Sequence, residues 1–523
     1  MRELVDVPVL IVGAGPVGLL MAAGLRHFGV DCMVVEKHAS TLDFPKGRRV
    51  TTRTVEIFRQ WGLEVAVSDV SLPQADSLFV FEGETLLGAD FQRRGMPVDV
   101  NRSSPTREVI CSQELLEPVL RKWDQDDGAD VRFSTKVVGF AQDDDGVTAE
   151  IVTHGEPVSV RAQYIVAADG VRGRTREALG VGRSGPGAFG HRVSILVEAD
   201  IEMRMKNRQS AVYWLWQPRP GSLFAAVDNK SRWLCVVPYD PDTEPRESLT
   251  EHRCMELVRG GLGDDSVEPR YLGHRIWEPT ALVVDRYQVG RVFLAGDAAH
   301  VTTPVGGLGM NCGVADVHNL AWKLAGVLAG WASPALLESY EPERRPHAFA
   351  CAAASLGPAQ PPNPVDGLVL GHVYESAVII DDQSAAPSAG DPIGEYLPVG
   401  RPGHRAPHLW LARGRSTLDL FGTEFIALTD PLGRLALDSA AGVARATGIP
   451  LVVHVIDAAA WHDLYGVERG GVVLVRPDGY VAWRSVGPPP KSHELGAALR
   501  VTAGHGPDDT NLERMADQAP LAQ

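Results

Sequence analysis

The sequence has few cysteines for its length and lacks the pairs that build redox or zinc centres. Among its 523 residues are six cysteines, none of which forms a Cys-x-x-Cys pair or joins histidines at zinc-ligand spacing. A disulfide scaffold, a dithiol centre and a zinc module are therefore excluded as the basis of the fold, and no metal site is predicted. Free thiols indicate a reducing compartment, so we expect a cytoplasmic protein.

Positive charge is also scarce in this sequence. Lysine and arginine number 50 against 66 aspartates and glutamates, which gives a formal net charge of −16. Nucleic acids and anionic membranes attract proteins through positive fields, so we expect neither as a partner. An uncharged run covers residues 7–25, but glycines and prolines interrupt it and it follows an acidic segment. We therefore predict neither a membrane span nor a signal peptide.

The chain is too long for one hydrophobic core, so two or three domains are expected, and the first begins with a strand–turn–helix unit. Residues 7–12 form an apolar, β-branched run, followed by Gly13-Ala-Gly15-Pro-Val-Gly18 and a helix extending to about residue 27. A second strand over 31–35 ends at Glu36. Such a unit binds a dinucleotide, because the glycines let a pyrophosphate approach the helix N-terminus and the acid binds a ribose.

Two later strands end in turns suited to the rest of a dinucleotide. Residues 164–168 run into Asp169-Gly170, and residues 291–295 run into Gly296-Asp297. A glycine-rich segment over 303–311 then leads into a helix predicted over 314–328. Another Gly-x-Gly-x-x-Gly, at 180–185, follows a helical segment instead of a strand. We therefore predict a loop there and a single dinucleotide site in the chain.

Together these motifs closely resemble one family, the single-component FAD aromatic hydroxylases, which are para-hydroxybenzoate hydroxylase-like flavoprotein monooxygenases. The glycine motifs have the family's order and spacing over about residues 5–350. The match extends through Asp316-x-x-Asn319-Leu-x-Trp-Lys323-Leu and Tyr340-Glu-x-Glu-Arg-Arg-Pro346. The resemblance implies FAD as the cofactor and a Rossmann-like, glutathione reductase-like α/β fold for the FAD-binding domain.

The resemblance also implies which residues contact FAD. The first glycine turn would hold the pyrophosphate, Glu36 the adenosine ribose, Gln113 the cofactor chain and Asp297 the ribityl. Amides at 307–311 would face the flavin pyrimidine edge and stabilise negative charge there. Asp169 would have a structural role near the flavin. The motif departs from the family at residue 173, where this chain has glycine and the family commonly has serine. The complete set is Gly13, Ala14, Gly15, Pro16, Val17, Gly18, Glu36, Lys37, Lys46, Gln113, Asp169, Asp297, Pro304, Gly307, Gly309, Met310 and Asn311.

One position in this set departs from the family. An arginine usually stands in the loop after the second strand, where this chain reads Pro45-Lys46-Gly47-Arg48-Arg49. Either Lys46 or Arg48 would take its role, and the bidentate fork of arginine is lost if the residue is Lys46.

Between the two halves of this domain the pattern changes to the alternation typical of antiparallel strands. We expect a substrate-binding sheet over 183–271, inserted into the FAD-binding domain. Tyr213 is a candidate for bonding a phenol, although aromatic residues in this segment also suit a sheet core. Arg107 is a candidate for contacting an anionic substrate. By the resemblance, Pro304 would form part of the oxygen-transfer pocket, and no catalytic base is identified.

The last third of the chain has a different composition. Residues 356–394 are rich in Pro, Gly, Ala and Asp and are predicted to be an irregular linker. Strand and helix then alternate, and the string Arg476-Pro-Asp-Gly-Tyr-Val-Ala-Trp-Arg resembles the thioredoxin-like C-terminal domain of phenol and polyketide hydroxylases. This domain lacks cysteine, which excludes thiol redox chemistry. The predicted division is 1–182 and 272–355 for the FAD-binding domain, with 71–103 left open between it and the substrate domain; 183–271 for the substrate domain; 356–394 for the linker; 395–503 for the thioredoxin-like domain; and 504–523 for a frayed tail.

The resemblance implies a monooxygenase that uses FAD, NADPH or NADH, and O2. It would hydroxylate a phenolic or polyketide-derived aromatic through a flavin C4a-hydroperoxide, in antibiotic biosynthesis. The same motifs allow Baeyer–Villiger or epoxidising oxygenation. A flavin-dependent halogenase and a non-catalytic flavin-binding protein are further alternatives. A homodimer is compatible with the sequence, which leaves the substrate, the regiochemistry and the oligomeric state open.

Overall fold

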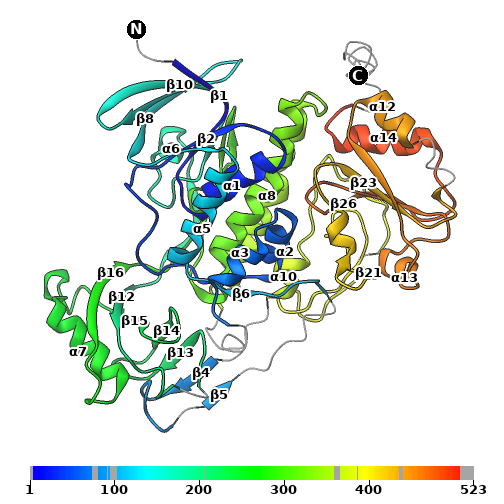
Figure 1. Ribbon diagram of the computed structural model, residues 1–523. Coiled ribbons are helices and arrows are strands. Elements are labelled where there is room, and N and C mark those ends of the chain that lie inside the picture. Colours follow the sequence, from blue (N-terminus) through cyan, green and yellow to red (C-terminus); the bar gives the residue numbers. More distant parts are fainter. Residues whose placement is uncertain are drawn as a thin grey trace.

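The computed structural model describes residues 4–73, 80–90, 92–94, 103–205, 208–357, 365–385, 387–434 and 440–506. Figure 1 shows a central part that contains the long helix α8 (Leu308–Leu328), an antiparallel sheet at one end and a C-terminal part beside α8. Most of the tail predicted over 504–523 lies outside the described residues. Within the described ranges, no helix is long and apolar enough to cross a membrane.

The central sheet brings together segments that are far apart in the sequence. Its strands are Leu4–Val12 (β1), Cys32–Val35 (β2), Asp130–Arg132 (β7), Thr135–Gln142 (β8), Val147–Thr153 (β9), Glu156–Ala167 (β10), Gln288–Val289 (β18) and Val292–Leu294 (β19). The order is β18-β19-β10-β1-β2-β7, parallel from β19 to β7, with β9 and β8 continuing from β10. Core clusters lie on both faces of β1 and β2, which explains their continuous apolar runs.

Helices cover this sheet and bring the predicted turns together. Helix α1 (Pro16–His27) packs against α8, and a Cβ added to Gly24 would lie 3.0 Å from that of Ala321, so the glycine permits the close approach. Helix α8 begins at Leu308, earlier than predicted, because the glycine-rich turn is itself the helix N-terminus. The other helices of this part are Thr52–Gln60 (α2), Glu64–Asp69 (α3), Gln113–Asp126 (α5), Arg174–Ala178 (α6) and Tyr340–Ala354 (α9).

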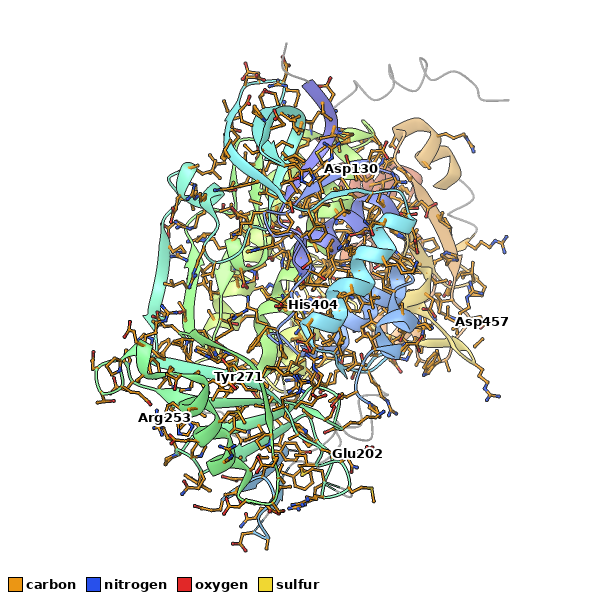
Figure 2. All side chains as sticks on the ribbon, turned by 60° about the vertical axis from the view of Figure 1, so that its left-hand side comes forward. Asp130, Glu202, Arg253, Tyr271, His404 and Asp457 are labelled. Carbon is orange, nitrogen blue, oxygen red and sulfur yellow. The ribbon has the colours of Figure 1, made fainter. Side chains whose placement is uncertain are left out.

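The second sheet is antiparallel except for one strand pair. Its strands are Val80–Gly83 (β4), Gln92–Arg94 (β5), His191–Glu198 (β12), Val212–Leu215 (β13), Ser222–Ala226 (β14), Arg232–Tyr239 (β15) and Arg270–Trp277 (β16). The order is β16-β12-β15-β14-β13-β4-β5, with β4 parallel to β13. Helix α7 (Glu251–Leu262) shares one core with this sheet. In Figure 2, Glu202, Arg253 and Tyr271 label this end of the molecule.

Smaller sheets connect the two parts. The strands are Arg49–Val50 (β3) with Val109–Ile110 (β6), and Arg183–Ala188 (β11) with Thr280–Val284 (β17) and His300–Val301 (β20). Strand β11 includes Gly185, so the loop predicted over 180–185 is wrong for its second half. The glycine there has φ +143°, and a Cβ would lie 2.5 Å from the carbonyl oxygen of Ala281. The glycine thus serves a close strand approach and not a ligand.

The C-terminal part has a mixed four-stranded sheet. Its elements are Trp410–Ala412 (β21), Arg415–Ser416 (β22), Phe425–Thr429 (β23), Ala440–Thr447 (α12), Leu451–Val455 (β24), Trp461–Tyr465 (α13), Val472–Val475 (β25), Val481–Ser485 (β26) and Ser492–Thr502 (α14). Strands β23 and β24 are parallel, and β25 and β26 are antiparallel neighbours in the order β24-β23-β25-β26. This is the predicted thioredoxin-like pattern, and the predicted α/β fold class is confirmed. In Figure 2, Asp457, which follows β24, labels this part of the molecule.

The segment predicted as a linker packs closely against both of its neighbours. A short helix, Asp366–Leu370 (α10), contributes Leu368 and Leu370 to the central core. Farther on, the ring of Tyr374 stacks on that of Tyr480 with centroids 3.9 Å apart. The connection therefore fixes the C-terminal part to the central part instead of leaving it free.

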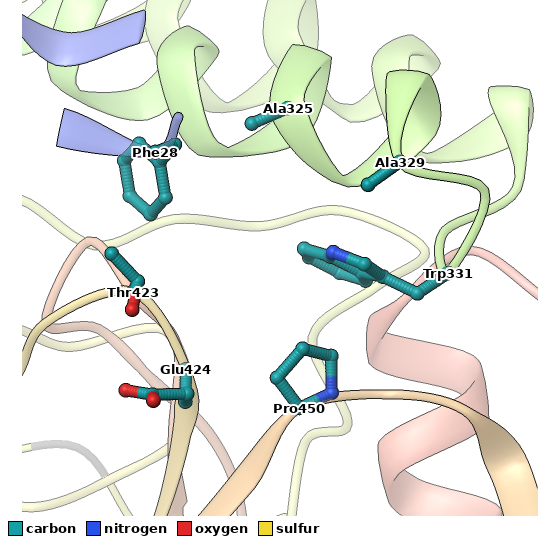
Figure 3. A pocket seen from close by; sticks show the side chains of 7 residues that line it. All are labelled: Phe28, Ala325, Ala329, Trp331, Thr423, Glu424 and Pro450. Atoms are coloured by element: carbon teal, nitrogen blue, oxygen red, sulfur yellow. The ribbon is translucent and has the colours of Figure 1, made fainter. Parts of the chain in front are cut away.

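A buried carboxylate joins the central part to the C-terminal part. Glu343 on α9 accepts hydrogen bonds from both terminal nitrogens of Arg476 (2.7 and 2.9 Å), from Lys323 (2.7 Å), from Asn319 (2.6 Å) and from Ser376 (2.7 Å). The side chains of Glu343, Lys323 and Arg476 are wholly inaccessible to solvent. At the rim of the same interface, Figure 3 shows a hollow of about 220 Å³ between Phe28 and α8 on one side and the C-terminal part on the other.

A second buried acid, Asp124 on α5, gives the fold a pH dependence. Neither carboxylate oxygen has a hydrogen-bond partner among the described residues, and burial together with the charge of Asp127 raises its pKa to about 8. An unfolded aspartate ionises near pH 4. Between about pH 4 and 8 the unfolded state therefore loses the proton that the folded state keeps, and each step of pH favours unfolding.

Replacing Asp124 by asparagine is therefore expected to stabilise the protein increasingly from pH 5 to pH 8. The pH-dependent part of the gain should be on the order of 5 kcal/mol at pH 8, because about four pKa units of linkage act on the unsubstituted chain and asparagine carries no proton to lose. Urea unfolding at saturating FAD measures it. The matched control is Asp126→Asn on the same helix, an exposed partner of Lys122 at 2.6 Å. A constant difference between Asp124→Asn and the unsubstituted chain across this range would contradict the argument.

Candidate functional site

The first glycine turn lies between β1 and α1, and each glycine has a separate steric reason. Gly13 has φ +106°, and a Cβ there would lie 2.4 Å from the Ala168 carbonyl oxygen. A Cβ on Gly18 would lie 1.8 Å from the Gly13 carbonyl oxygen. Gly15 differs, because its Cβ would meet nothing within 4 Å. Pro16 is the first residue of α1, and no side chain caps the helix, so its first amides face this open space.

The acid at the end of β2 closes this turn from the other side. Glu36 accepts hydrogen bonds from the amides of Ala14 (3.0 Å) and His38 (2.9 Å). The adjacent Lys37 is exposed and lies close enough to Asp169 to lower that group's pKa slightly. The burial of Asp169 outweighs this effect and raises its pKa overall. The sequence-predicted residues Ala14, Glu36, Lys37 and Asp169 therefore gather at one edge of the parallel sheet.

Asp169 holds the turn that follows β10. One carboxylate oxygen accepts hydrogen bonds from the amide (3.1 Å) and the hydroxyl (2.9 Å) of Thr175, and the other is buried with no partner among the described residues. A Cβ on Gly173 would lie 2.1 Å from that second oxygen. Serine at 173 is therefore incompatible with this arrangement, which accounts for the glycine where the family commonly has serine.

The Gly296-Asp297 turn lies directly against the first glycine turn. A Cβ on Gly296 would lie 2.8 Å from a methyl of Val17, so the two turns touch through this pair. The carboxylate of Asp297 accepts a hydrogen bond from Lys46 at 3.3 Å, and both side chains remain partly exposed. Lys46 thus lies at the predicted cofactor site, next to the residue expected to bind the ribityl.

The third turn forms the N-terminus of α8. Gly306 and Gly307 both have positive φ, +77° and +65°, and no side chain caps the helix that follows. The side chain of Asn311 fastens the turn, since it donates to the carbonyls of Gly307 (2.6 Å) and Arg49 (2.8 Å). Its oxygen accepts from the amide of Thr51 (2.9 Å). The first-turn amides of α8 are therefore the groups that remain to meet a ligand.

Gln113 and Met310 support the loop that carries Lys46. The side-chain oxygen of Gln113 accepts from the amide of Gly47 (3.3 Å), and its nitrogen donates to Glu117 (2.7 Å). A Cβ on Gly47 would lie 3.7 Å from the sulfur of Met310. Gly309 is confined in the same way, since its Cβ would lie 3.0 Å from the hydroxyl of Thr302. Pro304 precedes the short 3-10 turn Val305–Gly307 and is exposed.

Comparison with known proteins identifies this arrangement of turns. Residues 6–355 match the family described as FAD binding domain, and residues 399–506 match the family described as aromatic-ring hydroxylase, C-terminal. A putative polyketide hydroxylase of Streptomyces halstedii is 37% identical over 92% of this chain and 94% of its own length. Tetracenomycin B2 monooxygenase-dioxygenase of Streptomyces olivaceus is 38% identical over 92% of this chain and 96% of its own.

A solved structure extends the similarity to three dimensions. The ternary complex of aklavinone-11 hydroxylase with FAD and aklavinone superposes with a TM-score of 0.87 at 32% identity, covering 96% of this chain and 100% of that one. The chain belongs to the FAD-dependent aromatic hydroxylases. It is an FAD-dependent monooxygenase, as the sequence resemblance implied.

In this hydroxylase, Arg48 does not lie at the cofactor turns. Its guanidinium donates to the carbonyls of Ala211 (2.8 Å) and Ala226, so it ties the loop to the antiparallel sheet. Burial lowers its pKa to about 10, which leaves the group charged at neutral pH. Of the two alternatives, Lys46 is the one whose side chain lies at the Gly296-Asp297 turn.

The structure does not support Tyr213 as a substrate contact. Its ring is fully buried in the core between the sheet and α7, stacked on Phe81 at 5.9 Å. Its hydroxyl donates to the carbonyl of Arg208 at 2.7 Å. Alternation along β13 was predicted correctly, but Tyr213 faces the domain core. Arg107 is exposed and lies just before β6.

Asp316 on α8 contacts the Gly296 turn, although the sequence reasoning did not name it as a site residue. One of its oxygens accepts from the amide of Gly296 (3.1 Å) and from His300 (2.7 Å), and the other accepts from Arg344 (2.9 Å). Burial works against its ionisation, but His300 and Arg344 outweigh it and hold the pKa of Asp316 below its ordinary value. Asp316 and Arg344 were visible in the family motifs, yet only the fold places them beneath the Gly296 turn.

Side chains that could bind a metal ion also gather around Asp316, although the sequence spacing predicted no metal site. Cys312, His347 and Cys351 bring one ligand atom each within 4.8 Å of one another, as do His300, Cys312 and Asp316. The guanidinium of Arg344 already contacts Asp316 and the Cys312 sulfur (3.6 Å). Arg344 thus supplies a positive charge to two members of the His300, Cys312 and Asp316 group.

Proposed function

We propose that this monooxygenase hydroxylates a phenolic or polyketide-derived aromatic compound, with NADPH or NADH as the reductant. The observation that carries the proposal is the convergence of three glycine turns next to the antiparallel sheet. Tetracenomycin- and aklavinone-modifying enzymes among the relatives support the substrate class. The buried cysteines form no disulfides, which supports a cytoplasmic location. A homodimer is compatible with the proposed function.

The residues at the turns fit FAD. The open space over Gly15, which a Cβ would fill, suits a pyrophosphate at the N-terminus of α1. Glu36 would bind the adenosine ribose, while Asp297 and Lys46 would face the ribityl and phosphates. The first amides of α8 would meet the pyrimidine edge, where they stabilise negative charge. Bound FAD supplies acceptance of hydride from the nicotinamide and activation of O2.

The chain's own contribution is to orient the aromatic ring and to exclude water. One face of the antiparallel sheet is apolar and packs on Phe44, from the loop that leads to Lys46. Leu223 and Trp277 lie at its partly exposed margin, where the Trp277 indole donates to the Ser194 hydroxyl at 2.8 Å. Arg275 stacks over Phe44 with 5.2 Å to the ring centre. We assign this face to the substrate, because it combines an apolar surface with a few fixed polar groups.

The test is oxidation of NADPH and NADH by the FAD-loaded enzyme, with a panel of phenols and polyketide-derived aromatics and product masses. We expect at least one compound to stimulate oxidation and to gain one oxygen atom with its ring intact. A lactone product would assign Baeyer–Villiger chemistry instead, and an epoxide would assign epoxidation. Chloride-dependent product formation would favour a halogenase. Absence of stimulated oxidation across the panel would contradict the proposal.

A further inference from the structure

The hairpin turn between β25 and β26 is buried in the interface with the central part. This interdomain turn, residues 476–480, belongs to the sequence string that resembles the family's C-terminal domain. Arg476, Asp478 and Tyr480 are at most 4% exposed. In a hairpin at the protein surface such residues would be exposed to solvent, so their burial here indicates a role at the interface. The flavin-binding function described above assigns none to them.

We propose that the interdomain turn positions the two flavin-side turns, Gly296-Asp297 and 307–311, so that the thioredoxin-like part contributes to FAD binding without touching FAD. Two separate sets of contacts lead from it to these turns. The inference rests on FAD as the cofactor and is independent of the aromatic substrate proposed above.

The first set of contacts reaches the Gly296 turn. Tyr480 stacks on Tyr374 with 3.9 Å between centroids, and the Tyr374 hydroxyl accepts from Arg344 at 3.1 Å. Arg344 in turn donates to Asp316 at 2.9 Å, and Asp316 accepts from the Gly296 amide at 3.1 Å. All these side chains are buried, where charged hydrogen bonds are strong and an unpaired group is costly.

The second set of contacts reaches the N-terminus of α8 through α2. The carbonyl of Asp478 accepts from Arg53 at 2.8 Å, and that of Pro477 accepts from Gln60 at 2.8 Å. Both donors belong to α2. The start of the same helix binds Asn311, whose oxygen accepts from the Thr54 hydroxyl at 2.7 Å. Displacing the interdomain turn therefore moves the helix that holds the third glycine turn.

The first contact set is tested by Tyr374→Phe, which keeps the stacked ring and removes only the hydroxyl that Arg344 uses. The matched control is Tyr465→Phe, since the buried Tyr465 hydroxyl bonds to the Pro407 carbonyl at 2.7 Å within the C-terminal part. We expect Tyr374→Phe to raise the FAD dissociation constant about threefold to tenfold and to alter the flavin absorption spectrum. Tyr465→Phe should change thermal stability alone.

The second test reshapes the interdomain turn itself. Gly479 has φ +76°, and its Cβ would lie 3.3 Å from the Phe421 ring, so Gly479→Ala strains the turn. Gly448→Ala is the control, because Gly448 also has a positive φ (+68°) with nothing within 4 Å of its Cβ position, and it belongs to neither set of contacts. Gly479→Ala should weaken FAD binding and speed amide exchange in peptides covering 294–311, while Gly448→Ala should do neither.

For each variant and its control, FAD titration of the apoenzyme measures the FAD dissociation constant and hydrogen exchange measures the protection of backbone amides. Circular dichroism checks that each protein is folded. A purely structural role would lower the melting temperature of variant and control alike and leave FAD affinity unchanged. Equal FAD dissociation constants within each pair, in folded protein, would overturn the inference. That result would leave the hydroxylation assay, and hence the proposed function, unaffected.

Discussion

Replacing Gly15 by valine is expected to yield a folded protein that no longer retains FAD. The structure separates the roles of the three glycines in the first turn, because only Gly15 has an ordinary φ and open space where its Cβ would stand. Valine at this position therefore leaves the apoprotein fold unstrained. Its side chain instead occupies the space proposed for the pyrophosphate.

The expected loss is roughly a hundredfold in FAD affinity. Blocking two amide contacts to a charged pyrophosphate costs about 3 kcal/mol, which corresponds to that factor. Since a ligand that binds only the folded state stabilises it, the thermal shift produced by added FAD should shrink accordingly. Fluorescence titration with FAD and melting curves with and without FAD measure the two effects.

The matched control is Gly139→Val in β8. Gly139 also has nothing within 4 Å of its Cβ position, but it lies on a strand away from the glycine turns. This variant should bind FAD as the unsubstituted chain does. Retention of FAD by Gly15→Val with unchanged affinity would remove Gly15 from the pyrophosphate site.

Local features of the sequence predicted much of the fold. Gly18 is required by a contact with Gly13 inside one strand–turn–helix unit, so its spacing alone carried the information, whereas Gly13 is confined by Ala168 after β10. Strand β2 appeared close to the predicted bounds, and β1 and β10 ended at the predicted turns but began earlier, at Leu4 and Glu156 instead of residues 7 and 164. The Pro-Asp-Gly segment at 477–479 lies in the turn between β25 and β26.

Contacts between distant segments could not be predicted in this way. Arg48 bonds to carbonyls 163 and 178 residues away, so no spacing rule identifies its partners. Tyr213 illustrates a second limit, because alternation separates two faces of a strand without showing which one meets the domain core. Asp316 had a visible motif, but its hydrogen bond to the Gly296 amide arises only when α8 packs against the turn.

The buried charges around α9 likewise join segments that are far apart in the sequence. Ion pairs that lose their water rarely add net stability relative to apolar residues, but removing one partner leaves an uncompensated charge. Glu343 and Arg476 therefore specify how the C-terminal part docks more than they strengthen the docking. Such a cluster makes the interface intolerant of substitution at its central carboxylate.

Replacing Glu343 by glutamine is accordingly expected to lower the free energy of unfolding by about 3–5 kcal/mol at neutral pH. Glutamine keeps the volume, but its amide nitrogen turns hydrogens toward Arg476 or Lys323. Arg476 keeps its ion pair with Asp478, whereas Lys323 loses the carboxylate that it contacts. Burial alone would raise the pKa of Glu343, yet Arg476 and Lys323 outweigh burial and hold that pKa well below its ordinary range. Urea unfolding at saturating FAD, repeated over a series of pH values, measures the loss.

The direction of the pH dependence follows from that lowered pKa. A carboxyl whose pKa is lower in the folded state contributes its full stability above the unfolded pKa, near pH 4 to 5, and loses it as the pH falls further. The difference between Glu343→Gln and the unsubstituted chain should thus be largest at neutral pH and shrink in acid. Asp130→Asn is the control, because Asp130 forms a bidentate pair with Arg132 that is partly exposed, so water replaces it at little cost. A Glu343→Gln loss no larger than that of the control, or one independent of pH, would show that the carboxylate does not hold the interface together.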